Sequence, residues 1–166
     1  HDVLSLLEHQ LVRGRVKVRL ELDESLPKVL GDENKLQQVF LNLILNAQDA
    51  MPSGGWLTIK TAAAGGQVSA EVADTGVGIS KEDIKRIYDL FFTTKRTGRA
   101  GTGLGLSISY GIVQEHSGHI SVDSAVGKGT RFQLKLPACE EIAESAQDDG
   151  SDEGVSEPRA FNVRGS

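Results

Sequence analysis

Hydrophobic side chains recur with two distinct periods along the first 137 residues of the chain. Between Arg15 and Leu22 they alternate with charged residues, which is typical of a half-buried strand. Between Leu36 and Ala50 they recur at every third or fourth position, which predicts one apolar face of a long helix behind the N-cap residue Asp32. Applied to the whole chain, these patterns predict helices over 1–13, 32–51 and 104–115, a short helix from Ser80, and strands over 15–22, 56–62, 68–74, 118–124 and 130–136.

The predicted elements make up an α+β domain. Pro27–Gly31, Gly65-Gly66 and Val126–Gly129 have the composition of turns, so hairpins and longer crossovers are mixed. The simplest arrangement that buries the apolar faces is a two-layer α/β sandwich, in which about three helices cover one face of a mixed sheet of roughly five strands. Residues 89–103 have no hydrophobic periodicity and contain three glycines, which is typical of a mobile loop.

Charge is distributed unevenly along the 166 residues. The chain has 18 Lys and Arg against 23 Asp and Glu, but eight of the acids lie in residues 139–158, which contain no Lys or Arg. From Ala138 onward, low hydrophobicity and dense negative charge predict a disordered tail. The first 138 residues hold 16 basic and 15 acidic side chains, so a strongly basic surface for nucleic acid is excluded.

Other features of the sequence narrow the class of protein. The single cysteine, Cys139, excludes an internal disulfide. The longest apolar run, Val39–Leu45, is far shorter than the about 20 residues that a membrane helix needs. The first residues contain neither a basic leader nor a cleavage signal. We therefore expect no direct membrane contact from this chain and a location in the cytoplasm.

Two amides interrupt the apolar part of the long helix. Asn42, Asn46 and Asp49 are spaced i, i+4, i+7, so they lie along one edge of the helix. A buried amide without a partner costs roughly 1–3 kcal/mol, so these side chains need partners. Either they bond to neighbouring backbone, or their oxygens serve as ligands for Mg²⁺, which prefers hard oxygen donors.

Two glycine-rich segments stand next to predicted secondary structure. In Asp74-Thr-Gly-Val-Gly-Ile79 the glycines allow backbone to pass close to a ligand, and Asp74 can accept a hydrogen bond from an exocyclic amine such as that of adenine. In Gly101-Thr-Gly-Leu-Gly-Leu106 the glycines precede a helix, whose N-terminus attracts phosphate. Neither segment is specific alone, because an ordinary strand–turn–helix connection explains the first, and the second is neither a P-loop nor a dinucleotide fingerprint.

A lysine in the predicted mobile loop is the remaining candidate. Lys95 ends the segment Phe91-Phe-Thr-Thr-Lys95. A loop cation can neutralise a terminal phosphate, although a solvated lysine is the commoner case.

The order of these motifs is more specific than any one of them. The amide helix, the Asp74 segment, the Lys95 segment, the second glycine segment and Gly127-Lys-Gly-Thr-Arg-Phe132 together resemble the ATP-binding catalytic domain of bacterial sensor histidine kinases. That family shares a Bergerat-type fold with DNA gyrase, the heat-shock chaperone of the same superfamily and mismatch-repair ATPases. The resemblance covers about residues 12–137, and residues 46–51 and 91–95 are most similar to the nitrogen-regulation class.

The resemblance implies ATP and Mg²⁺ as cofactors and assigns roles by position. Asn46 matches the Mg²⁺ ligand, Asn42 the companion amide near the phosphates, and Asp74 the residue that reads adenine. Thr130 matches a threonine that supports the adenine site, and Lys95 the lid cation, so that Lys95 and Asn42 are the catalytic candidates. Further nucleotide contacts are implied for Asp49, Gly76, Gly78, Ile79, Phe92, Thr94, Gly101, Thr102, Gly103, Leu104, Gly105 and Leu106, and an aromatic box for Phe91 and Phe92.

One substitution bears on the reaction. Hydrolysing members of the superfamily carry a Glu four residues before the Mg²⁺ ligand, as the base that activates water. Here that position is Asn42, and an amide cannot accept the proton. The resemblance therefore implies transfer of the γ-phosphoryl group to a protein. A non-catalytic nucleotide-binding scaffold and an ATPase or Ser/Thr kinase on the same fold are the alternatives.

Departures from the family pattern affect the expected partners. Tyr88-Asp-Leu90 replaces the usual Phe-x-Pro, and no acceptor-histidine motif occurs; His9 lies on the first helix without it. We therefore expect residues 1–13 to be the end of a helical dimerisation and phosphoacceptor domain, 14–137 the ATP-binding domain, and 138–166 the acidic tail. The expected partners are that acceptor domain and a response regulator, with no nucleic acid. The isolated chain is expected to be monomeric, and its parent a bacterial protein, such as a membrane receptor with this part in the cytoplasm.

Overall fold

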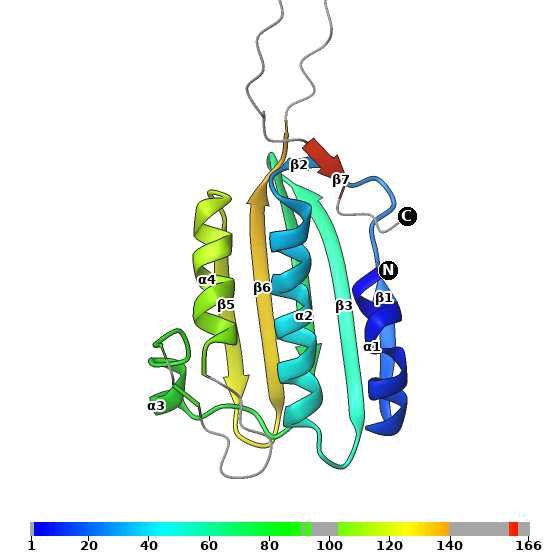
Figure 1. Ribbon diagram of the computed structural model, residues 1–166, viewed down its shortest axis with the longest axis vertical. Coiled ribbons are helices and arrows are strands. Elements are labelled where there is room, and N and C mark those ends of the chain that lie inside the picture. Colours follow the sequence, from blue (N-terminus) through cyan, green and yellow to red (C-terminus); the bar gives the residue numbers. More distant parts are fainter. Residues whose placement is uncertain (1, 91, 94–102, 140–159, 163–166) are drawn as a thin grey trace, which may run out of the picture.

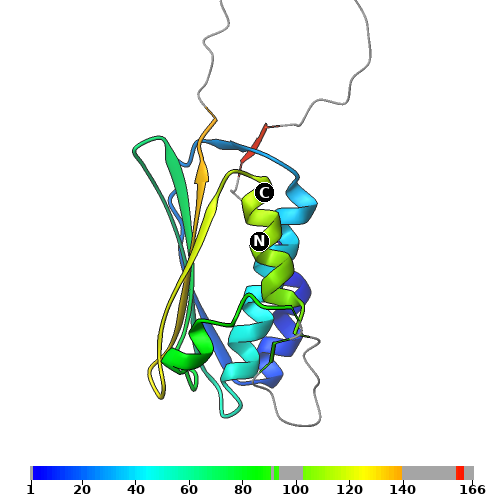
Figure 2. The same cartoon turned by 90° about the vertical axis from the view of Figure 1, so that its left-hand side faces the viewer.

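The computed structural model describes residues 2–90, 92–93, 103–139 and 160–162 (Figure 1). Its centre is a five-stranded mixed sheet in the order β1-β3-β4-β6-β5. Strand β1 pairs with β3 in parallel, and the other neighbours pair antiparallel. The three longer helices lie on one face of this sheet (Figure 2), so the predicted two-layer α+β sandwich is confirmed. The strands are β1 Val16–Glu21, β3 Gly55–Ala64, β4 Gln67–Asp74, β5 His119–Ala125 and β6 Gly129–Pro137.

The helices begin where the sequence predicts. The side chain of Asp32 accepts a hydrogen bond from the backbone N–H of Lys35, and that of Ser80 accepts one from Asp83, so both predicted N-caps are confirmed. Both caps satisfy a backbone donor that the first helical turn leaves unpaired. The helices are α1 Asp2–Arg13, α2 Glu33–Ala50, α3 Lys81–Ile84 and α4 Gly105–Glu115.

The core lies between α2 and the sheet. The predicted stripe of α2 is buried from Leu36 to Ala47, with Val39 at 0% and Leu43 at 1% exposure. Opposite it, Leu57 and Leu134 of the sheet are fully buried. Each such side chain contributes about 1.5–3 kcal/mol through removal from water. This packing fixes α2 on the sheet and thereby determines which edge of the helix remains open.

Two short strands were not predicted. The segment Pro27–Gly31, predicted to be a turn, contains strand β2 Lys28–Leu30, and β2 pairs antiparallel with β7 Ala160–Asn162. Strand β7 falls within the acidic segment that was predicted to be disordered, so that prediction is wrong at these three residues. Residues 140–159 and 163–166 lie outside the described part of the chain. A three-residue strand whose partner is distant in sequence leaves no periodic signal.

Among the described residues, no helix is long and apolar enough to span a membrane.

Candidate functional site

A cavity of about 460 Å³ opens between the C-terminal half of α2, the end of β4 and the start of α4. These elements meet near the lower end of the sheet in Figure 1. The walls are mainly apolar, with a small number of polar groups, which is the usual character of a site for a small organic ligand. The lining residues are Asn42, Leu45, Asn46, Asp49, Ala50, Asp74, Val77, Gly78, Ile79, Ile87, Phe92, Thr93, Gly103, Gly105, Leu106, Thr130 and Phe132.

The polar edge of α2 forms one wall of the cavity. Asn42, Asn46 and Asp49 all line it, as their helical spacing predicts. The Nδ2 group of Asn42 donates to the backbone oxygen of Gly105 at 3.1 Å and to Oγ of Ser109 at 3.2 Å. The alternative in which the amide bonds to neighbouring backbone therefore holds for the nitrogen of Asn42. The side chain of Asn46 makes no hydrogen bond to any of the described residues, which leaves its amide open to a ligand.

The loop after β4 forms the floor of the cavity. Its shape depends on two glycines that approach other backbone closely. A side chain at Gly76 would collide with Ala50, and one at Gly78 would collide with Ala125; Gly78 also has a φ of +73°, which favours glycine. Between them, the N–H of Val77 donates to the backbone oxygen of Ala50 at 2.9 Å. The loop is thus fixed against the end of α2.

Asp74 presents a carboxylate at the end of β4. Its Oδ1 accepts a hydrogen bond from the N–H of Gly76 at 2.8 Å, and the residue lines the cavity. Burial raises the pKa of this carboxyl, and hydrogen bonds from the backbone of Gly76 and Thr130 only partly oppose the rise. A ligand that donates to the carboxylate would relieve this cost, so Asp74 is poised to accept a hydrogen bond.

Thr130 is held by the hydroxyl group of Ser124, a contact that the sequence pattern did not predict. Its Oγ1 lies 2.9 Å from Oγ of Ser124. Ser124 also accepts from the N–H of Ile79 at 2.8 Å and donates to the backbone oxygen of Gly129 at 2.8 Å. Ser124 therefore joins the loop after β4 to β6. It lies within an alternating strand, where a serine carries no signal of its own.

Most of the predicted site residues lie together, with several exceptions. Gly76 and Leu104 are described but do not line the cavity. Phe91, Thr94, Lys95, Gly101 and Thr102 lie outside the described residues, as does most of the loop predicted over 89–103. Six further lining residues, most of them apolar, were not predicted from the sequence. Leu45 was predictable, because it lies between Asn42 and Asn46 in the same helix and shares their edge. The missed residues are Leu45, Ala50, Val77, Ile87, Thr93 and Phe132.

The oxygen atoms on the polar wall of the cavity suit a cation that is held jointly by protein side chains and by a phosphate. Asn42, Asn46 and Asp49 bring hard oxygen atoms to one wall. Within the described ranges, no group of three or more His, Cys, Asp and Glu side chains could enclose a metal ion by itself. Mg²⁺ fits such a site, because it keeps several waters and is commonly held by one or two protein oxygens together with substrate phosphates.

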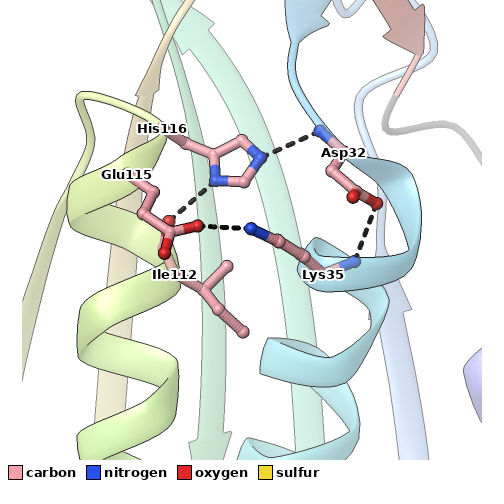
Figure 3. A network of polar contacts seen from close by, with 5 residues as sticks. All are labelled: Asp32, Lys35, Ile112, Glu115 and His116. Atoms are coloured by element: carbon pink, nitrogen blue, oxygen red, sulfur yellow. Dashed lines mark hydrogen bonds and ion pairs between the residues drawn. The ribbon is translucent and has the colours of Figure 1, made fainter. Parts of the chain in front are cut away.

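A second polar network joins α2 to α4 at the end remote from the cavity (Figure 3). Nε2 of His116 accepts from the N–H of Asp32 at 2.9 Å, and its Nδ1 lies 2.7 Å from the backbone oxygen of Ile112. Because Nε2 acts as an acceptor, the proton of the neutral ring is on Nδ1. Beside it, Lys35 pairs with Glu115 at 2.7 Å. Helix α4 is therefore tied to α2 at both of its ends, here and through the contact of Gly105 with Asn42.

The segment that departs from the family pattern contains a buried hydroxyl. The ring of Tyr88 packs against Tyr110 with centroids 5.0 Å apart. Its Oη is buried and has no hydrogen-bond partner in the described part of the structure. Burial, followed by the proximity of Tyr110, raises the pKa of Tyr88 to about 12. The side chain therefore acts as a packing residue, and its hydroxyl is not stabilised.

Comparisons with known proteins agree with one another. Residues 31–140 match the family "Histidine kinase-, DNA gyrase B-, and HSP90-like ATPase". Sporulation kinase E of Bacillus subtilis is 39% identical over 89% of this chain, and sensor kinase CckA of Brucella abortus is 40% identical over 88%. The matched regions are only 20% and 17% of those two proteins, so the chain spans about a fifth of their length.

Solved structures give the same result. The catalytic domain of histidine kinase ThkA, in a nucleotide-free form, superimposes with a TM-score of 0.72 at 30% identity, over 82% of this chain and 88% of that one. Full-length ShkA in complex with AMPPNP gives a TM-score of 0.73 at 29% identity, over 82% of this chain and 28% of that one.

Proposed function

Because the chain belongs to the family of histidine kinase-, DNA gyrase B- and HSP90-like ATPases, we propose that it is the catalytic ATP-binding domain of a two-component sensor histidine kinase. The observation that carries the proposal is the cavity, in which Asn46, Asp74 and Gly105 come together from three separate segments. In this role the domain binds ATP with Mg²⁺ and transfers the γ-phosphoryl group to a histidine on a separate domain.

The adenine base is proposed to bind at the end of β4. Oδ2 of Asp74 accepts a hydrogen bond from the exocyclic amine, while Oδ1 remains bonded to Gly76. The buried hydroxyl of Thr130 lies on the same side of the cavity and is held by Ser124. Apolar walls that include Ile79 and Phe132 enclose the base on its faces. ShkA, whose structure contains the ATP analogue AMPPNP, supports a nucleotide as the ligand of this fold.

The phosphates are proposed to extend from the base toward the start of α4. Gly103 and Gly105 line the cavity there, and the N-terminus of α4 attracts negative charge. Asn46 is the proposed Mg²⁺ ligand, with Asn42 and Asp49 beside it. When bound, Mg²⁺ neutralises charge on the phosphates. The proposed phosphate contacts also include residues outside the described part of the chain, namely Thr94, Lys95, Gly101 and Thr102.

Transfer is proposed in preference to hydrolysis. Where hydrolysing relatives carry a glutamate base, this chain has Asn42, whose amide cannot accept a proton from water. In the proposed step the bond between the γ-phosphorus and its bridging oxygen breaks, and a bond forms from that phosphorus to an imidazole nitrogen of the acceptor. ADP leaves with the bridging oxygen. The protein contributes by positioning the groups and neutralising charge.

The proposal extends to the partners. Residues 1–13 are proposed to be the end of the helical dimerisation domain that carries the acceptor histidine, 14–137 the catalytic domain and 138–166 an acidic tail. A response regulator would receive the phosphoryl group in turn. The isolated chain is proposed to be a monomer, and its parent to act in the bacterial cytoplasm, either free or as the inner part of a receptor. Relatives named as sensor and sporulation kinases support this assignment.

A phosphotransfer assay tests the proposal. The purified chain is incubated with Mg²⁺, ATP labelled in the γ-phosphate and a helical-hairpin domain that carries an acceptor histidine; the same hairpin with that histidine replaced is the control. We expect acid-labile label on the hairpin and no steady release of phosphate without it. Steady release in the absence of the hairpin would favour an ATPase. Nucleotide binding without any labelled product would favour a non-catalytic scaffold.

A further inference from the structure

Ser109 is buried against the site but has no role in the function proposed above. It lies on α4 with 0% exposure, and in the described part of the chain only Thr130 is a comparably buried polar residue. Its Oγ donates to the backbone oxygen of Gly105 at 2.8 Å, one turn earlier in the same helix. The same Oγ accepts from Nδ2 of Asn42 at 3.2 Å. Ser109 is therefore bonded to the first turn of α4 and to an amide that lines the cavity.

The hydrogen bonds around Asn42 determine which way its amide points. A serine hydroxyl has one proton, and that of Ser109 is used on Gly105, so a lone pair faces Asn42. The other neighbour of the amide is the backbone oxygen of Gly105, which is also an acceptor. Only the NH₂ group of Asn42 fits between two acceptors. The opposite orientation would place Oδ1 against the carbonyl oxygen of Gly105.

We infer that Ser109 is a positioning residue that holds the Asn42 amide with its NH₂ toward α4 and its Oδ1 toward the cavity. The inference rests on the proposed function and specifies it further. Oδ1 can accept a hydrogen bond from a water molecule of a hydrated divalent cation, or bind the cation directly, but it cannot donate to a phosphate oxygen. Asn42 therefore interacts with the cation rather than with the phosphates. Ser109 determines that preference indirectly, through its hydrogen bond with Asn42.

Ser109→Ala is the variant that tests this role. It removes the hydroxyl and leaves Asn42 with one anchor instead of two. Loss of an outer hydrogen bond of this kind lowers metal affinity by about tenfold or more. The matched control is Ser107→Ala, because Oγ of Ser107 also donates to a backbone oxygen at the start of α4, that of Leu104 at 2.9 Å, and makes no hydrogen bond to Asn42 in the described part of the chain.

The readout is ADP affinity measured by calorimetry over a series of Mg²⁺ concentrations and in a chelator. In Ser109→Ala we expect that the Mg²⁺ concentration which produces half of the full change in ADP affinity rises about tenfold. The ADP affinity measured in the chelator should be unchanged. Ser107→Ala should match the wild type in both conditions. Equal Mg²⁺ dependence in the two variants would overturn the inference, and so would an equal loss of affinity with and without Mg²⁺, which a merely structural role predicts.

A measurement on the wild-type chain tests the inference without requiring that any variant folds. The Nδ2 protons of Asn42, observed by NMR, should exchange slowly with water, because both of their acceptors lie in the protein. Fast exchange, like that of an exposed asparagine, would show the opposite orientation and overturn the inference. If the wild type bound no ADP in any condition, the proposed function would fail and the role toward the cation would fail with it. Nucleotide binding by a wild type with a fast-exchanging Asn42 would refute the inference alone.

Discussion

At the scale of single residues, the site contains groups whose environment lowers stability and favours recognition. Asp74 is the clearest case, since burial raises the pKa of its carboxyl and two backbone hydrogen bonds only partly offset that effect. A half-buried carboxylate whose burial is only partly compensated binds a suitable donor strongly, because binding removes a cost that the free protein carries. The same side chain should therefore weaken the fold and strengthen the complex.

Replacement of Asp74 by Asn separates these two effects. Asn keeps an acceptor for the N–H of Gly76 but loses the charge. We expect nucleotide affinity to fall by about 1–3 kcal/mol, which is roughly ten- to a hundredfold. Because the pKa is raised in the folded state from its ordinary 3.8, the charged form destabilises the free protein as pH rises through the folded value. At neutral pH the variant should therefore unfold at higher denaturant than the wild type.

The pH dependence provides the control for that experiment. At a pH well below 3.8 the carboxyl is protonated in both states, so the stability difference between Asp74→Asn and wild type should shrink. Denaturant unfolding at several pH values, without nucleotide, measures it. An unchanged nucleotide affinity in the variant would refute the proposed adenine contact, whatever happens to stability.

Asn46 provides a second test at this scale. Its amide lines the cavity and makes no hydrogen bond to the described residues, so Asn46→Ala should leave the fold intact. We expect the variant to lose the Mg²⁺ dependence of ATP binding, because the proposed oxygen ligand is removed. Asn34→Ala, at an exposed position in the first turn of α2, is the matched control. A wild-type Mg²⁺ titration for Asn46→Ala would contradict its role as a ligand.

Tyr88 offers a test of packing near the site. Its buried Oη has no partner among the described residues, so the hydroxyl carries a desolvation cost. Tyr88→Phe should raise the free energy of unfolding by about 1 kcal/mol, measured by denaturant titration at pH 7, where a pKa of about 12 keeps the wild-type hydroxyl protonated. Tyr110→Phe, on the other ring of the pair, serves as the comparison. A clear loss of stability in Tyr88→Phe would show that the hydroxyl has a partner.

At the scale of elements, the site depends on how α2 and α4 are held together. The start of α4 is joined to the middle of α2 by Asn42. The end of α4 is joined to the start of α2 by His116 (Figure 3). The imidazole lies directly over Gly31, where a side chain would overlap ring atoms. Gly31 is thus required by the space that His116 occupies. The exposed Lys35–Glu115 pair lies beside this contact and is expected to add little, as exposed ion pairs usually do.

A double-mutant cycle tests the contact between Gly31 and His116. Gly31→Ala should destabilise the protein by about 1–3 kcal/mol through overpacking, and His116→Ala by about 1 kcal/mol through the lost hydrogen bond to Asp32. In the His116→Ala background, the effect of Gly31→Ala should largely disappear, because the ring is gone. Denaturant unfolding of the four proteins gives the coupling. Additive effects would show that the two positions do not share this contact.

The sequence predicted elements well where the signal is local. The α2 stripe from Leu36 and the caps at Asp32 and Ser80 follow from periodicity and side-chain chemistry within one helix. Strands β2 and β7 were missed because each is three residues long and their pairing is distant in sequence. Ser109 and Ser124 carry no local signal, because their roles depend on partners from other elements. His116 stands at the end of α4 as a C-terminal cap, but its contact with Asp32 is distant in sequence. The polar wall was predictable from helical spacing, and its serine supports were not.

At the scale of the whole molecule, the β2–β7 pair lies at the upper end of the sheet in Figure 1, and the end of α2 and the start of α4 lie at the lower end. Those two helix ends line the cavity. The nucleotide is proposed to bind where the end of β4, the C-terminal half of α2 and the start of α4 meet. The core between α2 and the sheet holds those three elements in place, so the proposed chemistry depends on a fold whose stabilising contacts are mostly apolar.

The central claim is that this cavity binds Mg²⁺ and ATP, and calorimetric titration tests it most directly. The purified chain would be titrated with ADP and with a non-hydrolysable ATP analogue, each with and without Mg²⁺, and Asp74→Asn would be titrated in parallel. We predict micromolar binding that strengthens with Mg²⁺ and weakens by about tenfold or more in the variant. A folded wild-type chain that binds neither nucleotide in any of these conditions would contradict the claim.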